Sequence, residues 1–211
     1  MPYQITSIDP KKTCLLVIDM QNLFLQPDSP LFVRAGRACV PKMKQFIDDC
    51  RAEGMQIIYT DSLHREGGKN AGHSVDNCSP LADESIDQEF MSRIIDELTP
   101  RKDLGDIVVS KPRYSAFIGT DLDLILRTLK IENIFIMGVC TDCCVFSTSR
   151  DADALSYNVA LMSDLVGTVD YKDLGYGALT GEQMTQAMLI CLNATTCHVM
   201  STEDFRALPR I

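Results

Sequence analysis

Six short segments of the chain are apolar at nearly every position, and segments with helical spacing separate them. The six are Thr13–Ile18, Met55–Tyr59, Asp106–Val109, Asn133–Val139, Asn158–Met162 and Cys197–Met200. A strand with one wet face alternates apolar and polar residues, whereas a strand buried on both faces is apolar throughout, as in a parallel sheet. The pattern therefore predicts a mostly parallel sheet of roughly six strands.

Four segments between these runs repeat apolar residues at a spacing near 3.6. They are Ala38–Ala52, Asp121–Lys130, Asp142–Leu155 and Gly181–Asn193. The segment Asp121–Lys130 starts acidic and ends basic, which suits the helix dipole. Alternating strands and helices imply right-handed crossovers. We expect an α/β protein, a three-layer α/β/α sandwich around a Rossmann-like sheet, with a single domain spanning residues 1–211.

Two stretches have no clear period. Ser62–Glu89 is rich in Gly, Ser, Asn and Asp, and Asp164–Leu179 is a shorter irregular stretch. A long loop inside a compact domain is uncommon and is often functional. The first stretch is either a surface excursion or a flap over a site.

Composition narrows the class of protein. The chain has 211 residues, 45% of them hydrophobic, with 20 basic against 29 acidic side chains and a net charge of −9. A free-standing nucleic-acid binder is normally basic, and an anionic membrane surface would repel this charge. No apolar run approaches the ~20 residues that span a bilayer, and the N-terminus lacks the apolar stretch of a signal peptide. We therefore expect a cytoplasmic protein that binds neither nucleic acid nor membrane, whose nine cysteines are reduced thiols.

Reactive side chains follow several of the predicted strands. Asp19 follows the first strand, Lys111 the third, and Cys140–Cys144 the fourth. Ligands of open α/β sheets bind at the carboxyl ends of strands, so these groups should converge. Each residue also has a simpler interpretation. Asp19 could merely cap the segment after its strand, and Lys111 could be an ordinary solvated lysine.

The segment Cys140–Cys144 enters a predicted helix. A cysteine in the first helical turn feels the positive end of the dipole, whose free N–H groups stabilise a thiolate or an oxyanion. Spacing alone does not choose a nucleophile among Cys140, Cys143 and Cys144, although Cys143 is expected to pack in the core.

Two other kinds of chemistry stay open. Cys140-x-x-Cys143 is a weak redox motif, and Asp61, His64 and His73 could hold a divalent ion. The alternative for Asp61, His64 and His73 is that they are simply exposed polar residues of a loop. We expect His198 to be a core residue whose ring has a hydrogen-bond partner. No Gly-rich phosphate loop and no G-x-S-x-G elbow occurs in the sequence.

Three motifs carry a family resemblance. They are LLVIDMQNLF (Leu15–Phe24), SKPRYSAFIGTDLDLILR (Ser110–Arg127) and IFIMGVCTDCCVFSTSRDADALSYNVALMSD (Ile134–Asp164). In this order and spacing the sequence resembles the isochorismatase-like cysteine hydrolases, which include nicotinamidases, N-carbamoylsarcosine and ureidoacrylate amidohydrolases, and isochorismatase itself.

The resemblance implies a set of site residues. It makes Asp19, Lys111 and Cys144 a catalytic triad, with a cis peptide at Val139–Cys140 and an oxyanion hole formed by the backbone N–H groups of Cys140 and Cys144. Phe24 and Tyr114 match pocket positions of relatives. We also expect His64 to contact substrate, and the anchors considered for a substrate carboxylate are Arg34, His64, Arg65 and Arg113.

The resemblance also implies an activity. Nicotinamidases bind metal through an Asp-x-His pair, but Ser62 stands two places before His64, so no metal or other cofactor is expected. Isochorismatases proper lack the nucleophilic cysteine, so Cys144 favours amide hydrolysis. We therefore expect a small amide, ureido or carbamoyl substrate, a thioester intermediate, and a homodimer or homotetramer. An isochorismatase-type hydrolase, a nicotinamidase, and a non-catalytic or redox protein are the alternatives.

Overall fold

Six parallel strands form one sheet at the centre of the molecule. The computed structural model describes residues 4–65, 68–77 and 87–211. The strands lie in the order β3-β2-β1-β4-β5-β6. Their bounds are β1 (Thr13–Ile18), β2 (Gln56–Ser62), β3 (Ile107–Lys111), β4 (Asn133–Val139), β5 (Asn158–Gly167) and β6 (His198–Met200). The expected six-stranded parallel sheet is confirmed.

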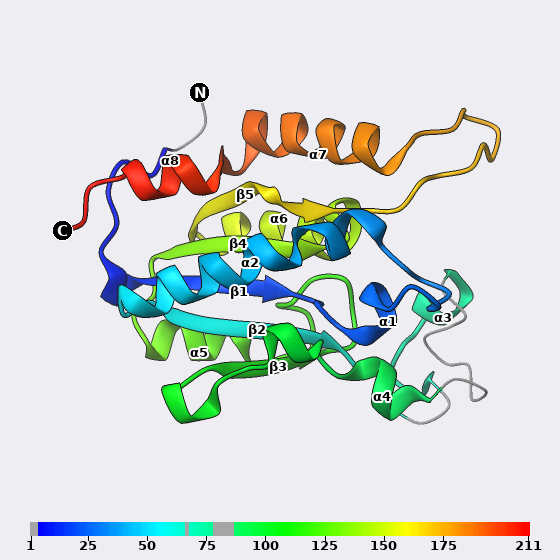
Figure 1. Cartoon of the computed structure of the whole chain (residues 1–211), viewed down its shortest axis with the longest axis horizontal. Coiled ribbons are helices and arrows are strands. Elements are labelled where there is room, and N and C mark those ends of the chain that lie inside the picture. The colour runs from blue at the N-terminus through cyan, green and yellow to red at the C-terminus, as the bar shows by residue number, and fades with distance from the viewer. Residues whose placement is uncertain (1–3, 66–67, 78–86) are drawn as a thin grey trace.

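Helices cover both faces of this sheet. The longer ones are α2 (Arg34–Ala52), α5 (Leu122–Thr128), α6 (Phe146–Ala154), α7 (Gly181–Thr195) and α8 (Thr202–Ala207). One buried cluster joins α2 and α8 to one face, and a second joins α5, α6 and α7 to the other. Figure 1 shows α2 lying across the front of the sheet with α5 and α6 behind it. This is the expected three-layer α/β/α arrangement.

Short elements fill parts of the chain where the pattern predicted no structure. They are α1 (Asn22–Leu25), α3 (Ser74–Asn77), α4 (Gln88–Ser92) and the 3-10 turns η1 (Pro10–Lys12), η4 (Asp96–Leu98) and η5 (Lys102–Leu104). Helices of four or five residues are too short to show a period. In the predicted irregular stretch 62–89, the possible flap lies partly outside the described residues.

Several predicted boundaries shift. The helix expected from Ala38 begins at Arg34, and the helix expected over Asp142–Leu155 divides into the π-helical turn η6 (Thr141–Val145) and α6. The expectation that the irregular stretch begins at Asp164 was wrong, because β5 continues to Gly167. The apolar run ends at Met162 because Ser163 and Asp164 are polar and only half-buried, but pairing with β4 resumes at Val166 after a register shift.

Gly138 lets β4 approach β1 closely beside the strand ends. Its φ is +127°, and a Cβ on it would lie 2.1 Å from the carbonyl oxygen of Ile18. Only glycine tolerates both the positive φ and this contact. The residues that follow β1 and β4 are therefore held next to each other.

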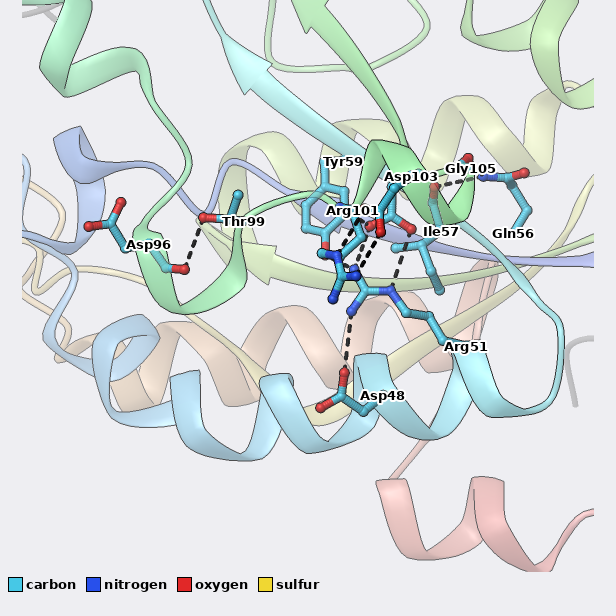
Figure 2. A network of polar contacts seen from close by, with 11 residues as sticks. Asp48, Arg51, Gln56, Ile57, Tyr59, Asp96, Thr99, Arg101, Asp103 and Gly105 are labelled. Carbon is cyan, nitrogen blue, oxygen red and sulfur yellow. Dashed lines mark hydrogen bonds and ion pairs between the residues drawn. The ribbon is translucent and has the colours of Figure 1, made fainter.

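A polar network anchors the edge strand β3 at its amino end. Arg51 of α2 forms an ion pair with Asp106, donates to the Tyr59 hydroxyl at 3.1 Å, and contacts Asp48 at 3.3 Å (Figure 2). Asp106 also accepts from the backbone N–H of Arg101 at 2.7 Å. Burial raises the pKa of Tyr59 to about 12. The network fixes the start of β3, the strand that ends at Lys111.

Among the described residues, no helix combines the length and apolarity needed to cross a bilayer.

Candidate active site

The strand arrows in Figure 1 point toward the end of the molecule where α1, α3, α4 and the segment between β5 and α7 lie. Three reactive side chains meet at this end. Lys111, the last residue of β3, places its Nζ 2.7 Å from Oδ2 of Asp19 and 3.3 Å from Sγ of Cys144. The side chains of Asp19 and Lys111 are both 0% exposed, and Cys144 is 7% exposed. The carboxylate, ammonium and thiol are thus in direct contact and nearly free of bulk water.

Asp19 is oriented by the neighbouring strand. It follows β1 with a φ of +50°, which turns the chain sharply after the strand. Thr60 of β2 donates from Oγ1 to Oδ1 of Asp19 at 2.7 Å, and the backbone N–H of Asp19 donates back to the same hydroxyl at 3.2 Å. One carboxylate oxygen is therefore held by Thr60 and the other by Lys111. Thr60 was assigned no role from the sequence, although it directly follows the apolar run Met55–Tyr59.

Lys111 is a buried ammonium with three partners. Besides Asp19 and Cys144, its Nζ donates to the backbone carbonyl of Arg113 at 3.0 Å. Burial opposes the charge, but the Asp19 carboxylate and the Cys144 sulfur outweigh it and hold the pKa of Lys111 above its usual value. The lysine therefore carries its charge throughout the physiological range.

Cys144 lies in the π-helical turn η6, directly before α6. Burial, followed by the Asp19 charge, raises the pKa of its thiol well above the ordinary value, while the Lys111 ammonium opposes them. Desolvation and the adjacent carboxylate dominate, so the sulfur keeps its proton until a base removes it.

The turn before Cys144 contains the expected cis peptide, between Val139 and Cys140. The Cys140 carbonyl accepts from the backbone N–H groups of Cys143 and Val145 at 3.2 and 3.1 Å. Burial raises the pKa of the Cys140 thiol, so this sulfur is also protonated. Cys140 and Cys143 form no disulfide with each other.

A cavity of about 550 Å³ opens beside Cys144. Phe24 and Tyr114 line it, as the resemblance implied. His64 was expected to line it too, but it is absent from the described lining residues, whereas Ser62 two places earlier is present. The difference arises because the chain leaves the sheet at Ser62, the last residue of β2.

Loops that the hydrophobic pattern did not mark supply further walls. Leu31 and Phe32 come from the connection between α1 and α2, and Val169 and Tyr171 from the segment after β5. Cys143 was expected to pack in the core, and it does pack against the cluster that includes α5, α6 and α7, but it is only half-buried and also lines this cavity. No periodic signal in the sequence marks these loop positions.

Asp142 ties the segment after β5 to the cysteine turn. Its two carboxylate oxygens accept hydrogen bonds from the hydroxyls of Thr168 and Tyr171. Burial and the bond to Asp142 raise the pKa of Tyr171. One wall of the cavity is therefore fastened to the turn that carries Cys144.

The loop histidines lie apart from this cavity. His73 is exposed and pairs with Asp76 at 2.9 Å, while both ring nitrogens of His64 are buried without a hydrogen-bond partner among the described residues. Burial, Lys111 and Arg113 together lower the pKa of His64. Within the residues that the structure describes, no group of three or more His, Cys, Asp or Glu side chains is arranged to hold a metal. His198 accepts from the backbone N–H of Ile5 at 3.1 Å, so its ring is partnered as expected.

The family model for the isochorismatase domain matches residues 13–204, which is most of the chain. The chain belongs to the isochorismatase family. The family is hydrolytic, and the resemblance inferred from the three sequence motifs is confirmed.

Solved structures of other isochorismatase-like proteins are similar throughout. A cysteine hydrolase from Pseudomonas syringae pv. phaseolicola has 28% sequence identity and a TM-score of 0.89, with 97% of this chain and 96% of that one covered. An N-carbamoylsarcosine amidase from Thermoplasma acidophilum has 25% identity and a TM-score of 0.70, with 90% and 96% covered. An isochorismatase family protein from Desulfovibrio vulgaris has 25% identity and a TM-score of 0.79, with 92% and 96% covered.

Proposed function

We propose that this isochorismatase-family protein hydrolyses a non-peptide C–N bond in a small amide, ureido or carbamoyl compound through a thioester on Cys144. The observation that carries the proposal is the contact of one buried ammonium with both a carboxylate and a thiol, 2.7 Å and 3.3 Å away, at the wall of a cavity. A carboxylate beside a protonated thiol is a general base beside a nucleophile.

In the first half-reaction, Asp19 takes the thiol proton as the sulfur of Cys144 attacks the carbonyl carbon. The raised pKa of the thiol favours a transfer that accompanies the attack. Lys111 keeps its proton, orients both partners, and stabilises the charge that develops on the sulfur as its proton leaves, before that charge reaches the substrate oxygen. The backbone N–H groups of Cys140 and Cys144 receive the oxyanion, an arrangement whose donors are each typically worth ~2.7–4 kcal/mol.

The tetrahedral intermediate then collapses. The C–N bond breaks, and Asp19 returns its proton to the departing nitrogen, which leaves as ammonia or an amine. In the second half-reaction Asp19 takes a proton from water, the hydroxide oxygen attacks the thioester carbonyl, and the C–S bond breaks. The sulfur regains the proton from Asp19, which restores the starting state. The similarity to a cysteine hydrolase and to an N-carbamoylsarcosine amidase supports amide rather than vinyl-ether chemistry.

The test is ammonia release from a panel of amides, ureas and carbamoyl compounds by the wild type and two cysteine variants. We expect Cys144→Ala to lose at least about 10³-fold in kcat/KM with the fold intact, because no other group replaces the nucleophile. Cys191→Ala is the matched control, since this half-buried thiol of α7 is outside the described cavity lining. Mass spectrometry of the quenched wild type should show an acyl adduct on Cys144. Turnover by Cys144→Ala at the wild-type rate would refute the proposal.

A further inference from the structure

The cavity beside Cys144 has mostly hydrocarbon walls. Seven of its described lining residues are apolar or aromatic, among them Phe24, Leu31, Phe32, Tyr114, Val169 and Tyr171. Its volume of about 550 Å³ falls within the range of small-molecule sites and exceeds the space that an amide group alone requires. The part of the ligand beyond the reacting carbonyl therefore meets hydrocarbon.

The charges around the cavity disfavour an anionic ligand. Of the described residues that line it, none is Lys, Arg or His, and Asp170 contributes a carboxylate. Asp170 is exposed at the rim, where it accepts from the backbone N–H of Gly181 at 2.7 Å. The nearby Lys111 ammonium is neutralised by Asp19 at 2.7 Å. A ligand carboxylate would leave water with no cation to receive it, which is costly.

The side chains predicted as anchors for a substrate carboxylate also disfavour an anionic ligand. Arg34, Arg65 and Arg113 are missing from the described lining, as is His64. Arg113 donates to the backbone carbonyl of Pro112 at 2.7 Å, and Arg34 is exposed at the start of α2. None of these side chains offers its charge to the described cavity.

We propose that the substrate is a neutral amide or carbamoyl compound whose acyl part is apolar, and that carboxylate-bearing analogues are rejected. The proposal deepens the proposed function and rests on it for the identity of the reacting group. Specificity then comes from burial of hydrocarbon, which is worth ~0.8 kcal/mol for each methylene, or about fourfold in kcat/KM per methylene.

Hexanamide and adipic acid monoamide make a matched pair of probes, because they differ by a methyl group against a carboxylate at the far end. In wild-type hydrolysis we expect kcat/KM to favour hexanamide by at least about tenfold, and to rise about fourfold per methylene from butanamide to hexanamide. In calorimetric titrations of Cys144→Ala, which has no nucleophile, we expect the same preference in Kd.

Leu31→Arg places a cation on the half-buried loop that lines the cavity. We expect this variant to shift the preference toward adipic acid monoamide by at least about tenfold, since a charge-assisted hydrogen bond contributes about that much. Leu31→Gln introduces a polar side chain without a charge and should not shift the preference. Leu174→Arg adds a cation at a residue that is 88% exposed and outside the described lining, and should also leave the preference unchanged.

The two measurements separate the two proposals. If Cys144→Ala binds hexanamide more tightly but the wild type hydrolyses neither compound, the cavity inference holds and the hydrolytic function fails. If the wild type hydrolyses adipic acid monoamide as well as or better than hexanamide, the function holds and the inference is overturned. Failure of Cys144→Ala to bind either compound up to the solubility limit also overturns the inference.

Discussion

Replacing Lys111 by Met leaves the Asp19 carboxylate buried without its counter-charge. Both side chains are 0% exposed and their charged atoms are 2.7 Å apart. The substitution also removes the hydrogen bonds from Nζ to the Arg113 carbonyl and the Cys144 sulfur, at 3.0 and 3.3 Å. Thr60 continues to donate to the carboxylate at 2.7 Å, so one of its two oxygens keeps a partner.

The magnitude follows from the geometry. At 2.7 Å, an effective dielectric constant of about 20 gives a Coulomb attraction of roughly 6 kcal/mol, and desolvation of the two ions offsets much of it. Removing one partner of a buried pair typically costs about 3–5 kcal/mol, because the other charge is left uncompensated. We expect that loss for Lys111→Met and also for Asp19→Asn. The double variant has no stranded charge, so its loss should be smaller than the sum by at least about 3 kcal/mol.

Urea denaturation of the four proteins, followed by circular dichroism, measures this double-mutant cycle. If a single variant does not fold but the double variant does, the coupling between Asp19 and Lys111 is demonstrated without a measured free energy. The reasoning is refuted if Lys111→Met is as stable as the wild type, or if the two losses add to within about 0.5 kcal/mol, as they do for independent sites.

Three further outcomes are expected from urea denaturation. Arg51→Met should lower the free energy of unfolding by about 2–3 kcal/mol, because the nearly buried Asp106 carboxylate loses its counter-charge. An unchanged urea midpoint would contradict this. Gly138→Ala should lower the free energy of unfolding by more than the ~1–2 kcal/mol expected for Gly54→Ala. Both glycines have a positive φ, but only at position 138 would the added Cβ clash with a backbone atom, 2.1 Å away. Equal losses would contradict this. Burial raises the pKa of Cys14 above 9.0 in the folded state, so only the unfolded chain releases this proton just above pH 9.0 and stability falls as pH rises. Cys14→Ala should make that slope shallower by about 1.4 kcal/mol per pH unit, and an unchanged slope would contradict the assignment.

The sequence by itself determined the sheet and the edge where the chemistry lies. Runs apolar at every position can be buried only between two layers, so the strands Thr13–Ile18 and Asn133–Val139 were predicted with their observed bounds. In a parallel sheet all carboxyl ends meet at one edge, and this alone predicted that Asp19 and Lys111 lie together. Local pattern and topology suffice for these features.

Only the tertiary structure decided the finer chemistry. The spacing of the cysteine segment left three thiols open. The contact of Lys111 with Cys144 joins the end of the edge strand β3 to the π-helical turn after β4, although β2 and β1 lie between these two strands. The protonation of that sulfur depends on its burial and on the Asp19 charge, which are three-dimensional quantities. The apolar walls at Leu31 and Val169 come from loops without periodicity. Such loop positions are set by long-range packing, so no local pattern in the sequence encodes them.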